Sequence, residues 1–361
     1  MSSRMNILGA SFFHRFHLAG DLTDISKAIL YQQKALHLTP EGDANMPGKL
    51  DDLGSSFGCR FERTRDLADI SEAISHQQRA VRLTPGGHAD MPGRLDDLGA
   101  SFRCRFECTG DLADISNAIS HQQRAVHLTP EGHSDMRRQL SNLGISFELR
   151  FERTGDPADL SDAISYIQRA VHLTPEGHAN MPGLLSNLGI SFLSHFKRTG
   201  DLADISNAIS HQQRAVHLTP EGHTNMPRQL TNLGLSFQHH FERTRELADI
   251  SNAISYQQRA VHLTPEGHAD MPGLLNNLGN ALQCRFDRTG DLADISGAIL
   301  YQQRGVHLTP EGHAGMPVWL SNLGVSLQCR FERTGDFADI SDAISHQLVL
   351  LLRAMQICSA G

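Results

Sequence analysis

Apolar residues recur along the chain at spacings of three and four, in segments that return every 45 residues. In the second of these segments, one apolar stripe consists of Leu50, Leu53, Phe57 and Phe61. Such spacing places the side chains on one face of an α-helix. We therefore predict a first helix in each repeat, called helix A below. It begins near Pro47 in the second repeat, because proline is tolerated in the first turn of a helix.

A second apolar stripe follows within the same repeat and predicts a second helix, called helix B below. Its members are Leu67, Ile70, Ala73, Ile74, Ala80 and Val81. Asp66 precedes this stripe and can cap the helix, while Asp69 adds negative charge to its first turn. The segment 84–87, Thr-Pro-Gly-Gly, ends it. Each repeat is thus predicted to be helix A, a short loop, helix B and another short loop.

A Leu-Gly pair in helix A sets the register of the repeats. Its glycines are Gly9, Gly54, Gly99, Gly144, Gly189, Gly234, Gly279 and Gly324. Eight repeats of 45 residues fill the chain of 361 residues, and Thr109–His133 recurs letter for letter at Thr199–His223. One helix pair cannot bury its own apolar stripes, so stability must come from stacking on neighbours. We predict a single array over residues 1–361, an all-α, right-handed α-α superhelical solenoid.

Aromatic residues fit this register. Of the 16 phenylalanines, 14 occupy two repeat positions, three and seven residues after the glycine. Such a regular arrangement is typical of core packing between helices rather than of an aromatic cofactor site. The glycine has a helix-interior cost of about 1 kcal/mol relative to alanine. We expect close approach of a neighbouring helix to offset this cost.

The repeat resembles the tetratricopeptide (TPR) signature. The matching residues are Leu53, Gly54, Phe57, Ala73, Ala80 and Pro85. The spacing from Ala73 to Ala80 and from Ala80 to Pro85 agrees with that signature, whereas the segments before Ala73 and after Pro85 are longer. The signature aromatic residue of helix B is replaced by Gln77. The signature tryptophan is also absent.

Among TPR subtypes, the long repeats are similar to those of kinesin light chain, for example over residues 265–279. They also resemble the large fungal TPR arrays that precede a caspase-like CHAT protease domain. Neither motor association nor protease activity is implied, because the chain contains no heptad-rich region and no CHAT sequence. The resemblance implies a scaffold that binds a protein or peptide in the concave groove formed by the helices A. The alternative is the sensor or regulatory array of a TPR–CHAT-like protein.

The candidate groove residues lie two positions before the glycine, where TPR proteins present a polar side chain to an extended peptide. They are Asp52, Asp97, Asn142, Asn187, Asn232, Asn277 and Asn322. An asparagine amide suits this role because it both donates and accepts hydrogen bonds. The apolar residues just after the glycine, Ile145, Ile190 and Leu235, are predicted to form an apolar floor with Leu149 and Leu193 nearby. The alternative is a polar surface without a ligand.

Other chemistry has little support in the sequence. Six of the 21 histidines occupy a Gly-His loop, namely His88, His133, His178, His223, His268 and His313. Because duplication spreads them over different repeats, we predict no metal site. Cys59, Cys104, Cys284 and Cys329 share one repeat position and are predicted to be structural thiols. Nucleotide-binding and nucleophile motifs are absent, so we predict neither enzymatic activity nor a cofactor.

Composition limits the partners and the compartment. The net charge of −8 argues against nucleic-acid binding, and no apolar run is long enough for a membrane span. With six cysteines, no CxxC motif and no signal peptide, we expect a reducing, cytoplasmic setting. The apolar segment Leu348–Met355 is predicted to drive self-association, or to be covered by sequence beyond this chain.

Overall fold

The computed structural model describes residues 1–310 and 312–345, and helices A and B alternate along them as predicted. The helices A are α1 (Ser2–Ala19), α3 (Met46–Thr64), α5 (Met91–Thr109), α7 (Met136–Thr154), α9 (Met181–Thr199), α11 (Met226–Thr244), α13 (Met271–Thr289) and α15 (Met316–Thr334). The helices B are α2 (Leu22–His37), α4 (Leu67–Leu83), α6 (Leu112–Leu128), α8 (Pro157–His172), α10 (Leu202–Leu218), α12 (Leu247–Leu263) and α14 (Leu292–His307). Residues 337–345 are also helical. The described ranges contain no strand, so the all-α fold class is confirmed.

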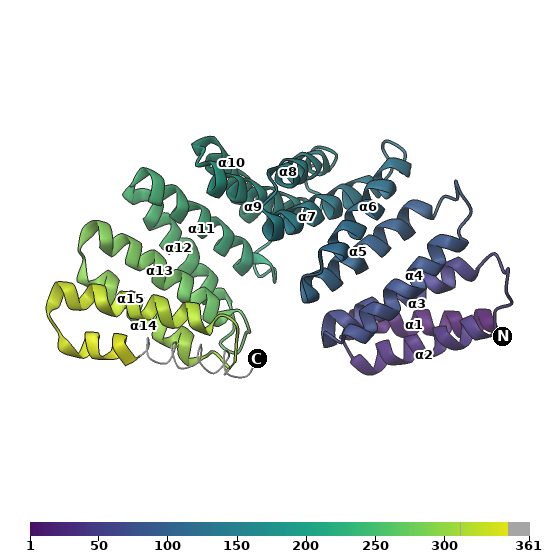
Figure 1. Cartoon of the computed structure of the whole chain (residues 1–361), viewed down its shortest axis with the longest axis horizontal. Helices are drawn as coiled ribbons and strands as arrows, with labels where there is room; N and C mark the ends of the chain where they lie inside the picture. The colour runs from purple at the N-terminus through teal and green to yellow at the C-terminus, as the bar shows by residue number, and fades with distance from the viewer. Residues whose placement is uncertain (311, 346–361) are drawn as a thin grey trace. The chain divides into compact units, whose positions relative to one another are not determined.

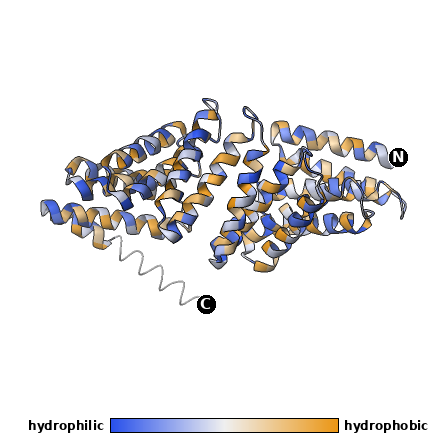
Figure 2. Cartoon of the chain, turned by 90° about the horizontal axis from the view of Figure 1, so that it is seen from above, coloured by the Kyte–Doolittle hydropathy of each residue, from blue (hydrophilic) through white to orange (hydrophobic). Residues whose placement is uncertain are grey.

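The chain divides into two compact units, Met1–Pro175 and Glu176–Gly361, called the N-terminal and C-terminal units below. Within each unit, helix A packs along helix B of its own repeat, and helix B packs against helix A of the next repeat (Figure 1). Apolar and polar residues alternate around the helices (Figure 2). Each unit is therefore a stack of amphipathic helix pairs that bury their apolar faces against one another.

Each unit has its own apolar core, and the predicted stripe of helix A lies in it. Leu50, Leu53 and Phe61 are fully buried, and Phe57 is 5% exposed. A cluster in the N-terminal unit extends from Phe16 to Ala163, and one in the C-terminal unit extends from Leu233 to Ala343. The packing role predicted for the repeated phenylalanines is thus confirmed.

The predicted stripe of helix B was wrong at one position. Ile70, Ala73, Ile74 and Ala80 are buried, but Leu67 is 47% exposed. Leu67 is the first residue of α4 and precedes the turn that enters the core. The equivalent leucines of other repeats, including Leu112 and Leu247, are similarly exposed.

The helix ends follow from the local sequence. Pro47 occupies the first turn of α3. The Asp66 side chain accepts a hydrogen bond from the Ala68 backbone N–H at 3.0 Å, as predicted for the cap of α4. Helix A of most repeats ends at a glycine in the left-handed conformation, such as Gly110 with φ 70°. Arg65 and Arg245 occupy this position in two repeats, with φ 58° and 62°.

Close packing within a repeat explains the glycine of the Leu-Gly pair. A Cβ atom on Gly54 would lie 2.7 Å from Gln77 Cγ and 3.1 Å from the carbonyl oxygen of Ala73. A carbonyl cannot move aside as a flexible side chain can. Glycine therefore permits the close approach of α3 and α4, as expected from the sequence.

Candidate functional site

The residues predicted to form the groove lie along the helices A at intermediate depth. Asp52 is exposed, and the other six polar candidates are half-buried: Asp97, Asn142, Asn187, Asn232, Asn277 and Asn322. The apolar candidates Ile145, Ile190 and Leu235 are half-buried as well. By contrast, Leu149 packs against the core of its unit and Leu193 is only 7% exposed. These two leucines belong to the core rather than to a groove floor.

Several of the polar candidates pair with the preceding helix A. We call a rung the pair formed by the residue three positions before the glycine in one helix A and the residue two positions before the glycine in the next. In the N-terminal unit, Asn6 Nδ2 donates to Asp52 Oδ2 at 3.3 Å, and Asn142 Nδ2 donates to Asp96 Oδ2 at 3.0 Å. Neighbouring repeats are therefore joined by side-chain hydrogen bonds that the sequence alone did not suggest.

The C-terminal unit contains the same arrangement with neutral residues. Asn232 Nδ2 donates to Ser186 Oγ at 3.4 Å. Asn322 Nδ2 donates to Asn276 Oδ1 at 3.0 Å. The bonds made by Asn142, Asn232 and Asn322 use the amide nitrogen, so the amide oxygen is the atom they can offer to an incoming N–H.

Among the rungs whose two members lie in the same unit, two have no hydrogen bond between their members within the described residues. One pairs Asp51 with Asp97 in the N-terminal unit. The other pairs Thr231 with Asn277 in the C-terminal unit, where Thr231 Oγ1 donates to the Pro227 carbonyl at 2.8 Å instead. In the described part of the chain, the Asn277 amide therefore has no side-chain partner across this rung.

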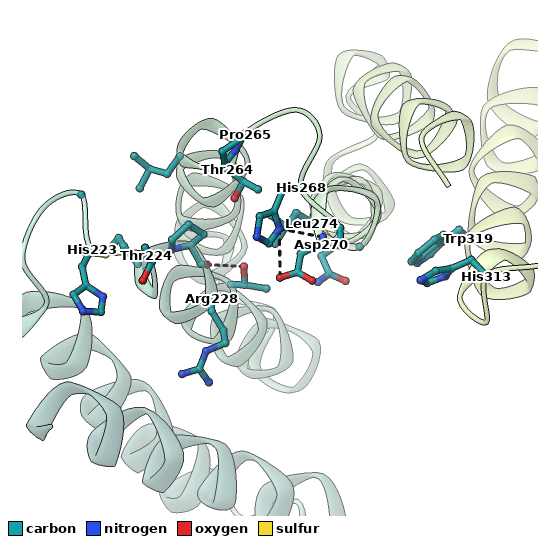
Figure 3. A pocket seen from close by; sticks show the side chains of 18 residues that line it. His223, Thr224, Arg228, Thr264, Pro265, His268, Asp270, Leu274, His313 and Trp319 are labelled. Atoms are coloured by element: carbon teal, nitrogen blue, oxygen red, sulfur yellow. Dashed lines mark hydrogen bonds and ion pairs between the residues drawn. The ribbon is translucent and has the colours of Figure 1, made fainter. Parts of the chain in front are cut away.

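A cavity of about 610 Å³ lies at the rung of Thr231 and Asn277 (Figure 3). Its walls come from the loops and first turns that lead into α11, α13 and α15, and from the end of α12. Met226, Leu263 and Leu274 contribute apolar surface. Trp319, the one tryptophan of the chain, also lines the cavity and stacks on His313 with ring centroids 5.0 Å apart.

The polar groups of this cavity come from His223, Arg228, His268, Asp270 and Asn277. The His268 ring lies 3.7 Å from the Asp270 carboxylate. Arg228 projects from α11 on the side of the cavity away from Trp319 (Figure 3). A mostly apolar cavity with a few convergent polar groups is the common form of a binding site.

A second cavity, of about 810 Å³, lies in the N-terminal unit, and Asn6 and Asp52 line it. Its two cationic side chains already have partners. Lys49 donates to Thr39 Oγ1 at 2.8 Å. Arg94 donates to Thr84 Oγ1 at 2.5 Å and to Asp90 at 3.0 Å.

Asp51 of α3 and Asp96 and Asp97 of α5 are carboxylates whose pKa is raised by burial. Asp96 is fully buried, and Arg138 of α7 donates to it at 2.6 Å and to Asp97 at 3.3 Å. Burial raises the pKa of Asp96 to about 6, against the opposing effect of Arg138. Burial and the adjacent Asp97 carboxylate raise the pKa of Asp51 to about 7.

The loop histidines have a structural role that the sequence reading missed. His133 Nδ1 accepts a hydrogen bond from the Asp135 backbone N–H at 3.2 Å, just before α7 begins. The same bond forms at His88, His178, His223, His268 and His313. In the first repeat Asp43 accepts the bond from Asn45 instead. Aspartate is a common hydrogen-bond acceptor in turns, so Asp43 at the histidine position could have indicated this role from the sequence.

The cysteines and the possible metal ligands are the remaining candidates for chemistry. Cys59, Cys104, Cys284 and Cys329 are half-buried free thiols. Burial raises the pKa of Cys59 to about 11. Within residues 1–310 and 312–345, no three His, Cys, Asp or Glu side chains are grouped so that they could hold a metal ion. None of the described helices is long and apolar enough to cross a membrane.

Searches for related sequences give no match, either among protein-family models or among curated proteins. Solved structures do match. The C-terminal part of a TPR repeat-containing protein from Cytophaga hutchinsonii aligns with 89% of this chain and 99% of its own length, at 14% identity and a TM-score of 0.53. This chain has the fold of a TPR array.

Two further structures resemble the TPR array over shorter stretches. One is a Podosopora anserina putative kinesin light chain with nearly identical TPR-like repeats (12% identity, 59% of this chain and 97% of that one, TM-score 0.44). The other is BtubC (BKLC) from P. vanneervenii (19% identity, 69% and 89%, TM-score 0.44).

Proposed function

We propose that this TPR array is a non-enzymatic scaffold that binds an extended segment of a protein partner along its helices A. The observation that carries the proposal is the cavity of about 610 Å³ at the rung where the Asn277 amide has no partner among the described residues. An extended peptide has unpaired backbone N–H and C=O groups, and a free amide can bond to both. The apolar walls formed by Met226, Leu263 and Leu274 would take a side chain of that peptide.

The hydrogen-bonded rungs refine the expected asparagine ladder. Asn142, Asn232 and Asn322 are each tied to the preceding helix A. We therefore assign the main peptide contact to Asn277, with the tied asparagines contributing their amide oxygens. The sensor role in a TPR–CHAT-like protein concerns sequence outside this chain and stays a prediction. Self-association through Leu348–Met355 also stays a prediction, because this segment lies outside the described residues.

The single tryptophan makes the proposal testable without a known partner. Peptides are selected from a displayed random library on the purified chain and then titrated while Trp319 fluorescence is recorded. We expect saturable fluorescence changes, and weaker binding by Asn277→Ala by roughly fivefold to tenfold, as for the loss of one hydrogen bond. Asn252→Ala is the control, because Asn252 is exposed on α12 and does not line the cavity. Selected peptides that leave Trp319 fluorescence and the Asn277→Ala affinity unchanged would refute this site.

A further inference from the structure

The rung between α3 and α5 differs chemically from its neighbours in the N-terminal unit. In the rungs on either side, an asparagine amide donates to a carboxylate, from Asn6 to Asp52 and from Asn142 to Asp96. The rung between them pairs Asp51 with Asp97, and two ionised carboxylates have no proton to donate. Asp51 Oδ1 is buried and has no hydrogen-bond partner among the residues that the structure describes. In the two neighbouring rungs an asparagine supplies the donor hydrogen, whereas in this rung neither member supplies one when both are ionised.

The charged groups around Asp51 do not supply that proton. Arg94 of α5 acts on Asp51 through its charge, but its side-chain hydrogen bonds go to Thr84 and Asp90. The other groups that act on Asp51 are Asp97, Asp52 and Asp90, which are all acidic. From α1, the Asn6 amide is directed to Asp52. Only a proton on one of the two carboxylates would join Asp51 to Asp97.

The surroundings of Asp97 decide which carboxylate takes the proton. Arg138 of α7 donates to Asp97 Oδ1 at 3.3 Å, and Asp135 is the other charged group that acts on it. Burial raises the pKa of Asp97, but the Arg138 guanidinium opposes this rise because it favours the ionised form. Asp51 lacks such a donor and is therefore the member that becomes protonated.

We propose that the Asp51–Asp97 rung is a proton-operated contact between the second and third repeats. Below neutral pH, protonated Asp51 donates a hydrogen bond to the Asp97 carboxylate, in the same direction as Asn6 donates to Asp52 one repeat earlier. Above neutral pH, the proton passes to water, and two like charges face each other across α3 and α5. The pKa of Asp51, raised by burial and by Asp97 to about 7, places this change near neutral pH.

The sign of the stability effect follows from this raised pKa. An aspartate in an unfolded chain has a pKa near 4, so between about pH 4 and 7 the folded chain holds a proton that the unfolded chain has released. The stabilisation from this proton is complete below the unfolded pKa and is lost as the pH rises through about 7. Deprotonation of the rung thus weakens the N-terminal unit on the alkaline side.

The variant Asp51→Asn tests the proposal, because it recreates the asparagine–aspartate rung of Asn6 and Asp52 with a permanent donor. Melting temperatures of the full chain are measured from pH 5.5 to 8.5. We expect the difference between Asp51→Asn and wild type to grow in favour of the variant as the pH rises. Comparing the two proteins at each pH cancels every pH effect that they share. Asp162→Asn is the control and should keep the wild-type profile, because Asp162 is exposed and is not among the groups that act on Asp51. Parallel profiles for wild type and Asp51→Asn would overturn the proposal.

A direct titration separates protonation from general stability. In a chain labelled with ¹³C at the aspartate carboxyl carbons, the Asp51 signal is the one missing in Asp51→Asn. Its midpoint is expected near pH 7, and in Asp97→Asn the midpoint should fall because a like charge is gone. A midpoint near pH 4 in the wild type, or no change in Asp97→Asn, would show that the two carboxylates are independent.

Discussion

Arg60 of α3 and Asp69 of α4 form a two-pronged ion pair: Arg60 Nε donates to Asp69 Oδ2 at 2.7 Å, and Nη2 donates to Oδ1 at 2.5 Å. The Asp69 side chain is only 6% exposed. Equivalent arginine pairs occur at Asp24, Asp114, Asp159, Asp294 and Asp339. The repeated aspartate at the third position of helix B thus joins the two helices of its own repeat, rather than neighbouring repeats.

Removal of this arginine should destabilise the N-terminal unit. Arg60→Ala leaves the Asp69 carboxylate buried without its partner, at a cost of about 2 kcal/mol. Arg60→His should cost less, because His195 and His240 make the corresponding bonds to Asp204 and Asp249 in two other repeats. Urea unfolding at pH 7 measures both changes. The exposed Arg79, replaced by alanine, is the control, and an Arg60→Ala effect no larger than that of Arg79→Ala would contradict the assignment.

Replacement of a buried glutamine should stabilise the chain. Gln122 is fully buried against Gly99, and within residues 1–310 and 312–345 neither its amide oxygen nor its amide nitrogen has a hydrogen-bond partner. Ile167 fills the same position in the fourth repeat and is also fully buried. We expect Gln122→Ile to raise the unfolding free energy by about 1–2 kcal/mol, because an unsatisfied amide is removed. The reciprocal Ile167→Gln should lower it, and a loss of stability in Gln122→Ile would show that the amide is satisfied in solution.

Replacement of Arg65 by glycine should stabilise the chain by relieving its left-handed backbone. Arg65 ends α3 with φ 58°, where glycine ends most other helices A. Left-handed backbone costs a residue with a Cβ atom about 1 kcal/mol more than glycine. Arg65→Gly should therefore stabilise by about 0.5 kcal/mol after loss of the stacking of Arg65 on Phe61. Thermal unfolding measures the gain, and the reverse change Gly110→Arg should destabilise. An unchanged melting temperature in both variants would mean that the backbone relaxes at this position.

Removal of the His133 ring should weaken the loop before α7. His133 Nδ1 accepts the Asp135 backbone N–H at 3.2 Å, and an alanine at this position has no acceptor. His133→Ala should therefore lower the unfolding free energy by about 1 kcal/mol, as for the loss of one hydrogen bond. His133→Asp is the matched control and should keep the wild-type stability, because Asp43 accepts the same bond in the first repeat. Urea unfolding measures both variants, and an unchanged stability of His133→Ala would show that this bond does not hold the loop.

The sequence was sufficient for the helix pairs, because their stripes, caps and stops are local. Leu53, Phe57 and Phe61 were placed correctly from spacing alone. Leu67 was misplaced because periodicity does not reveal where, within its first turn, a helix meets its neighbour. The repeat position of the groove residues could be predicted from the sequence, but their hydrogen-bond partners could not. Asn142 meets Asp96 across 46 residues, one more than the repeat, and that offset is known only once the stacking of the helices A is known.

The side-chain pairs between successive helices A also distinguish repeats whose sequences are nearly identical. α6 and α10 have the same sequence, so their apolar faces cannot distinguish the helices that should follow them. Arg138 of α7 distinguishes them, because it pairs with two carboxylates on α5, whereas the same positions of α9 hold Ser186 and Asn187. A repeat that docks in the wrong order during folding would bury one of these charges without a counterion. Charged pairs therefore disfavour an incorrect order of repeats in a chain whose apolar faces are nearly the same in each repeat.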